Sequence, residues 1–245
     1  MHRPGRPEDL EHPDRLWARA ATLTTIAAAG GPGGFRVGST GLHYWSPGGA
    51  YWWQLTLAPA GEAVLSGQDS DASHTHLQPR PLDLLAGLPD RLIWDELRRD
   101  HRDFVLGYAY WFVDGAWHRV PYPDRVKDDG LAFSAKYLAG DSGIPTALAE
   151  QVEWDEWDED EDADLDAAGD AVAAAAAAFL ARAHARTVDA AAVAELVDAL
   201  APGRPPDGRS ITDYADAALR AATHLGLTGT QRPPMLGDGS ATQKF

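Results

Sequence analysis

The stretch His43–Leu57, with the sequence HYWSPGGAYWWQLTL, decides the fold of this chain. It predicts two strands joined by a turn at Ser46–Gly49, because two aromatic runs flank a Ser-Pro-Gly-Gly sequence. Successive side chains of a strand point to opposite faces. Residues 51–57 therefore present one wholly apolar face, which we expect in the core, and Trp52 shares the other face with Gln54 and Thr56.

A second aromatic stretch, Phe104–Val120, predicts another hairpin. Its turn falls at Asp114-Gly115, because both residue types tolerate the positive φ angles of a two-residue hairpin loop. That turn brings Trp117 opposite or close to Phe112 on the neighbouring strand. The two hairpins together predict the middle of an antiparallel sheet.

Outside the hairpins the pattern is helical. Pro13 suits the start of a helix that ends at the glycine run 30–34, and short helices are expected at Pro81–Ala86 and Leu92–Asp100. Residues 124–146 predict no regular element. In the C-terminal third, helices are expected from Asp170, from Thr187 and from Ser210, where Ser210 and Asp213 form the pattern of a capping box.

These elements predict an α+β protein: an antiparallel sheet of about five strands with flanking helices, followed by a small alanine-rich helical module. The predicted division is a disordered tail at 1–12, an aromatic-rich sheet domain at 13–148, an acidic linker at 149–169, the helical module at 170–227 and a disordered tail at 228–245.

Negative charge is concentrated in one segment. Residues 146–170 carry 12 Asp and Glu and no Lys or Arg, whereas residues 1–145 have a net charge of −4 and residues 171–245 of zero. No basic face for nucleic acid is expected. The chain has no cysteine, no apolar run long enough to span a membrane and no apolar run behind its N-terminal charges, so we expect a cytoplasmic protein without a membrane partner.

Aromatic residues allow two interpretations. They fill the core of a small sheet protein, or part of them form an exposed face for a partner, since aromatic rings with polar tips favour interfaces. The residues assigned to that face are Tyr44, Trp52, Trp117 and Tyr122.

The acidic segment is a solvated linker, a docking segment for a basic protein, or a weak calcium site. Trp154 and Trp157 favour docking, because a simple spacer has no use for tryptophan. The charged residues beside them complete the predicted partner-binding set: Asp155, Glu156, Asp158 and Glu159.

Candidates for chemistry are few. Asp69, Asp71, His74 and His76 could bind one divalent metal ion, and the competing interpretation is a polar loop whose Asp and Ser residues form turns. Asp95, Glu96 and Asp103 offer paired carboxylates, which on a short helix more often form its solvated face. There is no Gly-x-Ser-x-Gly sequence, and no resident cofactor or catalytic residue is predicted.

The sequence therefore favours a protein-binding module over an enzyme. An acidic α+β protein without a catalytic signature is similar in general appearance to bacterial immunity and adaptor proteins, which implies a protein partner. Two other hypotheses stay open: a metal-dependent hydrolase centred on the loop Asp69–His76, and a structural subunit that self-associates through its alanine-rich helices.

Overall fold

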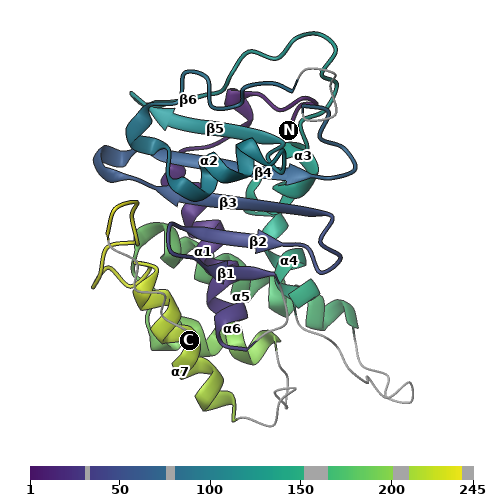
Figure 1. Cartoon of the computed structure of the whole chain (residues 1–245). Helices are drawn as coiled ribbons and strands as arrows, with labels where there is room; N and C mark the ends of the chain where they lie inside the picture. Colours follow the sequence, from purple (N-terminus) through teal and green to yellow (C-terminus); the bar gives the residue numbers. More distant parts are fainter. Residues whose placement is uncertain (31–33, 76–80, 152–164, 201–209, 239–245) are drawn as a thin grey trace. The chain divides into compact units, whose positions relative to one another are not determined.

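The computed structural model describes residues 1–30, 34–75, 81–151, 165–200 and 210–238. It confirms an α+β protein built on an antiparallel sheet of six strands, one more than the approximate count expected from the sequence. The strands follow one another in chain order across the sheet (Figure 1). They are β1 Phe35–Val37, β2 Leu42–Trp45, β3 Tyr51–Leu57, β4 Ala63–Asp69, β5 Tyr108–Val113 and β6 Ala116–His118.

The described helices are α1 Pro13–Ala28, α2 Asp95–Arg102, α3 Leu131–Ser134, α4 Gly143–Gln151, α5 Leu165–Ala185, α6 Ala190–Leu200 and α7 Ile211–His224. Single turns of 3₁₀ helix lie at Pro7–Asp9, Pro59–Gly61, Asp90–Leu92 and Lys136–Leu138. No helix within these described ranges is long and apolar enough to cross a membrane.

Local signals in the sequence placed several elements correctly. Asp114 and Gly115 take φ angles of 51° and 79°, and Phe112 pairs with Trp117 across the turn. In α7, Ser210 Oγ accepts a hydrogen bond from Asp213 N while the Asp213 carboxylate accepts from Ser210 N, as in a capping box.

Other expectations were wrong. Pro81–Ala86 forms an irregular segment and a turn instead of a helix. The main-chain N–H groups of Ala86 and Leu88 donate to the carbonyl oxygens of Asp83 and Leu85, three residues earlier, as in turns. Residues 124–146, where no element was expected, contain α3 and the start of α4. The second hairpin begins at Tyr108 and not at Phe104, whose φ angle of 59° lies outside the strand region.

The chain forms two compact units. Of the described residues, the sheet unit comprises 1–17, 37–75, 81–139 and 234–238, and the helical unit comprises 18–30, 34–36, 140–151, 165–200 and 210–233. Within the helical unit, the Nε of buried Arg19 donates to Asp141 Oδ1 at 2.6 Å. Within the sheet unit, Leu236 N donates to Leu57 O at 2.7 Å, although residues 228–245 were expected to form a disordered tail.

Both faces of the sheet are largely buried, and the face that carries Trp52 also holds the polar side chains of Gln54, Thr56 and Ser66. The face that carries Trp52, Val64 and Trp111 is covered by leucines of the segment 84–97, and α2 lies across it (Figure 1). Trp52 is therefore 6% exposed. The opposite face carries Tyr108 and Tyr110, both fully buried, and Tyr108 is hydrogen-bonded to Ser134 at the end of α3.

Candidate functional site: a groove beside the last strand

The N-terminal segment, predicted to be a disordered tail, is bound to the sheet by three hydrogen bonds to distant residues. Gly5 N donates to Asp129 Oδ1 at 3.0 Å, and Arg119 Nε donates to Gly5 O at 3.0 Å. Further along, Trp117 Nε1 donates to Glu11 O at 2.7 Å. These bonds satisfy main-chain groups at both ends of the segment and fix its course beside β6.

Asp129 is the centre of this attachment. Its buried carboxylate accepts four hydrogen bonds: from Gly5 N and Leu131 N on Oδ1, and from the hydroxyls of Tyr110 and Tyr122 on Oδ2. Burial raises the pKa of Asp129, while the four donors act in the opposite direction. Because an ionised carboxylate only accepts hydrogen bonds, a set of four donors suits its charged form.

Glycine is required at position 5 by close packing. A Cβ atom there would lie 2.6 Å from Leu131 Cδ2 and 2.7 Å from the Tyr110 hydroxyl. Next to this contact, the Arg119 guanidinium stacks 3.8 Å from the centre of the Tyr122 ring. Asp129 and Arg119 therefore bind the two main-chain groups of Gly5, and Tyr122 contacts both of these side chains.

An open groove of about 350 Å³ lies between the attached segment and the β5–β6 hairpin. We call it the Trp117 groove. One wall comes from the segment and the other from the hairpin, and the lining residues are Pro7, Glu8, Leu10, His12, Phe112, Gly115, Ala116 and Trp117.

Aromatic contacts set the shape of the Trp117 groove. Phe112 and Trp117 meet edge to face with centroids 5.5 Å apart, and His12 meets Phe112 edge to face at 5.1 Å. Trp117 has its indole N–H bonded to Glu11, so its side chain adds no unsatisfied donor to the groove. The groove is thus an apolar cleft whose lining includes one carboxylate, that of Glu8.

Two ionisable side chains line the groove, those of Glu8 and His12. Glu8 is exposed and forms no ion pair within the described residues. His12 Nδ1 is 3.3 Å from Asp14 N, which donates to it, and 3.6 Å from Asp14 Oδ2. No serine, threonine or lysine is among the lining residues.

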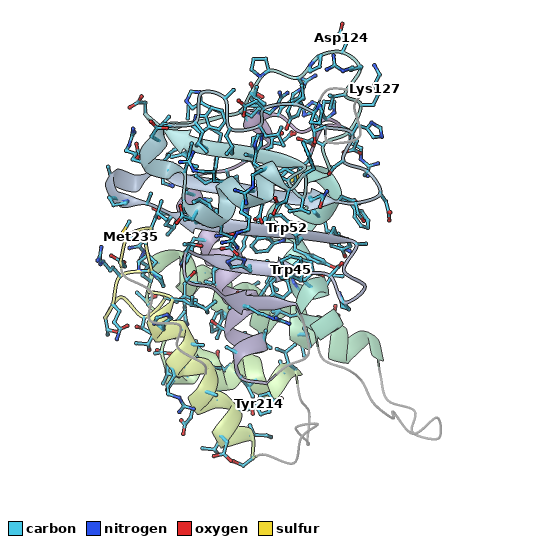
Figure 2. All side chains as sticks on the ribbon, in the orientation of Figure 1. Trp45, Trp52, Asp124, Lys127, Tyr214 and Met235 are labelled. Carbon is cyan, nitrogen blue, oxygen red and sulfur yellow. The ribbon has the colours of Figure 1, made fainter. Side chains whose placement is uncertain are left out.

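The predicted partner-binding aromatics fall at three different places. Trp117 lines the groove, and the hydroxyl of half-buried Tyr122 is 3.2 Å from Asp129. Tyr44, Trp52 and Trp117 are each 6% exposed, so the exposure expected for them is absent. Trp45, which was not predicted, stacks on Trp52 at 5.5 Å and is 45% exposed (Figure 2).

The acidic part of the prediction falls largely outside the described residues. This applies to Trp154, Asp155, Glu156, Trp157, Asp158 and Glu159.

The loop after β4 shows turn bonding at the predicted metal ligands. Asp69, which is 4% exposed, accepts hydrogen bonds from Asp71 N and Ala72 N on Oδ1. His74 N donates to Asp128 O. His76 lies outside the described residues, and among those described no group of three His, Asp or Glu is arranged to hold a metal ion.

The carboxylates of α2 lie on the other side of the sheet. Burial, together with the neighbouring charge of Glu96, raises the pKa of Asp100 to about 6. Burial lowers the pKa of His43, and Glu96 opposes this shift. Of the carboxylates predicted here, Asp95 and Asp103 are exposed and Glu96 is half-buried. Asp100 was missed, because spacing along a helix does not show which carboxylate is buried.

Apart from Trp117, none of the residues that line the groove was predicted from the sequence as a site residue, and neither was Asp129. The only local signal was the hairpin register that brings Phe112 to Trp117. Comparison with protein-family models, with curated proteins and with solved structures finds no match to this chain.

Proposed function

We propose that this protein is a protein-binding module that engages a basic partner. The observation that carries the proposal is the Trp117 groove, an open apolar cleft lined by the carboxylate of Glu8, which forms no ion pair with another described residue. Apolar contact area with a few placed polar groups is the usual composition of a recognition site. Trp117, which the sequence assigned to a partner surface, lines the groove although its side chain is 6% exposed.

The acidic segment supports the sign of the partner's charge. With 12 carboxylates and no Lys or Arg between residues 146 and 170, it attracts basic proteins and accelerates their encounter. This attraction is screened over ~8 Å at physiological ionic strength. The groove and the segment thus have different expected roles: the groove supplies short-range contacts, and the segment supplies a salt-dependent association rate.

Affinity capture from native lysate tests the proposal when four proteins are compared at low and high salt. The first is the wild type. The second has Asp155, Glu156, Asp158 and Glu159 changed to their amides. The third is Ala116→Phe, which places a ring at an exposed residue of the groove lining, and the fourth is Ala86→Phe, which places the same ring on an exposed loop outside it.

A protein captured by the wild type and Ala86→Phe, and reduced with Ala116→Phe and with the amide variant, fits the proposal. Its purified form should then show a slower association rate with the amide variant and a faster dissociation rate with Ala116→Phe. Equal capture by all four proteins, or capture that does not weaken at high salt, would contradict it.

A further inference from the structure

The Trp117 groove lies beside a main-chain edge of the sheet, that of β6. β6 is the last strand of the sheet, and in a two-residue hairpin the pair next to the turn exchanges hydrogen bonds while the following pair does not. That following pair is Phe112 and Trp117, so the N–H and C=O of Trp117 point away from β5. Within the described residues, no main-chain hydrogen bond beyond the ladder involves either group.

Side chains beside this edge define what could lie along it. The apolar lining of the groove includes half-buried Pro7 and the side chains of Phe112 and Leu10, each 7% exposed, and Glu8 adds an exposed carboxylate. The surrounding charge has the same sign: residues 6–15 together with Asp114 include five acidic residues and two arginines. One of those arginines, Arg15, lies 3.6 Å from Glu11.

The size of the groove limits its occupant. A volume of about 350 Å³ is at the lower end of the ~300–1,000 Å³ found for small-ligand sites, and it accommodates one or two side chains. In an extended peptide, side chains two residues apart point the same way and are about 7 Å apart. A strand added to β6 would therefore direct alternate side chains into the groove.

We infer that the Trp117 groove binds an extended segment of a basic protein, which pairs with the outer edge of β6. One apolar side chain of the segment lies on Phe112 and Leu10, and a lysine or arginine two residues away lies beside Glu8. This inference rests on the proposed function, and it specifies the kind of sequence that the partner presents.

Fluorescence anisotropy with labelled synthetic peptides tests the inference on the full chain. The probe is a short Ser- and Thr-rich peptide with Leu and Arg two residues apart. Three derivatives change one feature each: Arg to Glu, Leu to Ser, and N-methylation of the amides around Leu and Arg. The protein variants are Glu8→Arg and, as a control on an exposed acid outside the groove, Asp124→Arg, whose position is labelled in Figure 2.

We expect the wild type to bind the Leu–Arg peptide and to lose about threefold to tenfold in affinity for the Arg-to-Glu peptide, as for a surface ion pair. Glu8→Arg should reverse this preference, whereas Asp124→Arg should keep it. The N-methylated peptide should bind more weakly than the unmodified Leu–Arg peptide, since N-methylation removes main-chain donors.

Two results would overturn the inference. One is a Leu–Arg peptide that binds no better than its Ser and Glu derivatives, and the other is a preference that Glu8→Arg does not change. If the lysate experiment still yields a partner that depends on the acidic segment, the proposed function stands and only the peptide assignment fails. If no protein is captured and no peptide binds, both fail.

Discussion

Two carboxylates on opposite sides of the sheet, the enclosed Asp129 and the half-buried Asp100, differ in how their negative charge is stabilised. Asp129 is fully enclosed and accepts four hydrogen bonds, from the main-chain N–H groups of Gly5 and Leu131 and from two tyrosine hydroxyls. Asp100, in α2, is half-buried beside the like charge of Glu96. Burial raises the pKa of both, but only Asp129 has a complete set of donors to stabilise its charge.

The difference indicates two kinds of role. Asp129 joins the N-terminal segment, β5 and α3, so we expect it to be needed for the native structure and for the Trp117 groove. Asp100 is destabilising when ionised, so we expect the folded protein to be more stable without its charge. Four substitutions test this contrast.

Removal of the Asp129 carboxylate should have the largest effect. Asp129→Ala leaves Gly5 N and two tyrosine hydroxyls without their acceptor, and we expect the free energy of unfolding to fall by about 3 kcal/mol. Asp129→Asn should fall by about half as much, because its amide oxygen still accepts from Gly5. Urea denaturation at neutral pH measures both, and a loss below about 1 kcal/mol for Asp129→Ala would refute the role of a central acceptor.

Gly5→Ala should act mainly on the groove. The added Cβ overlaps Leu131 and the Tyr110 hydroxyl, and overpacking of this kind typically removes about 1–2 kcal/mol of stability. Because the segment is held by few contacts, we expect it to move away, so that the Trp117 indole N–H loses Glu11 O. The NMR signal of that N–H should shift. Gly48→Ala, whose Cβ would meet nothing within 4 Å, should leave it unchanged.

Asp100→Asn should stabilise the protein, by about 1 kcal/mol at pH 7 after allowance for solvent screening. With a pKa of about 6 in the folded state and an ordinary value of 3.8, Asp100 binds more protons when folded. The ionisation of Asp100 therefore lowers the free energy of unfolding as the pH rises from 3.8 to 6. Asp100→Asn has no such ionisation, so its stability lacks this decrease. Unfolding curves from pH 4 to 7.5 should diverge with rising pH, and parallel curves would contradict the assignment.

Tyr122→Phe should have the smallest effect. It removes the longer of the two tyrosine bonds to Asp129, at 3.2 Å, and keeps the ring under Arg119. We expect a loss of about 0.5–1 kcal/mol, less than for Tyr110→Phe, whose bond is 2.7 Å. The reverse order in urea denaturation would show that ring packing, and not hydrogen-bond length, governs the tyrosines.

Interactions that are local in the chain could be predicted from the sequence, and those between distant residues could not. The turn at Asp114-Gly115 and the capping box of Ser210 and Asp213 depend on residues within a few positions of one another. Asp129 is 124 residues from Gly5, and its importance comes from a contact that no local pattern encodes.

The wrong predictions likewise concern contacts between residues that are distant in the chain. Residues 1–12 are rich in proline and charge, which is typical of a disordered tail, yet their structure comes from Asp129, Arg119 and Trp117. Tyr44 and Trp52 were assigned to an exposed face because a single strand cannot show what covers it. The leucines around Trp52 follow in a segment that the sequence presented only as two short helices.

The hydrogen bond between Leu236 and Leu57 bears on how this gene can be dissected. The sheet unit draws on three stretches of chain, because residues that follow α7 return to it. A protein truncated after residue 151 would lose α5–α7 and, with them, the partner of Leu57 O. The phenotype of such a truncation therefore does not assign an activity to one unit. Point substitutions confined to a single unit allow that assignment.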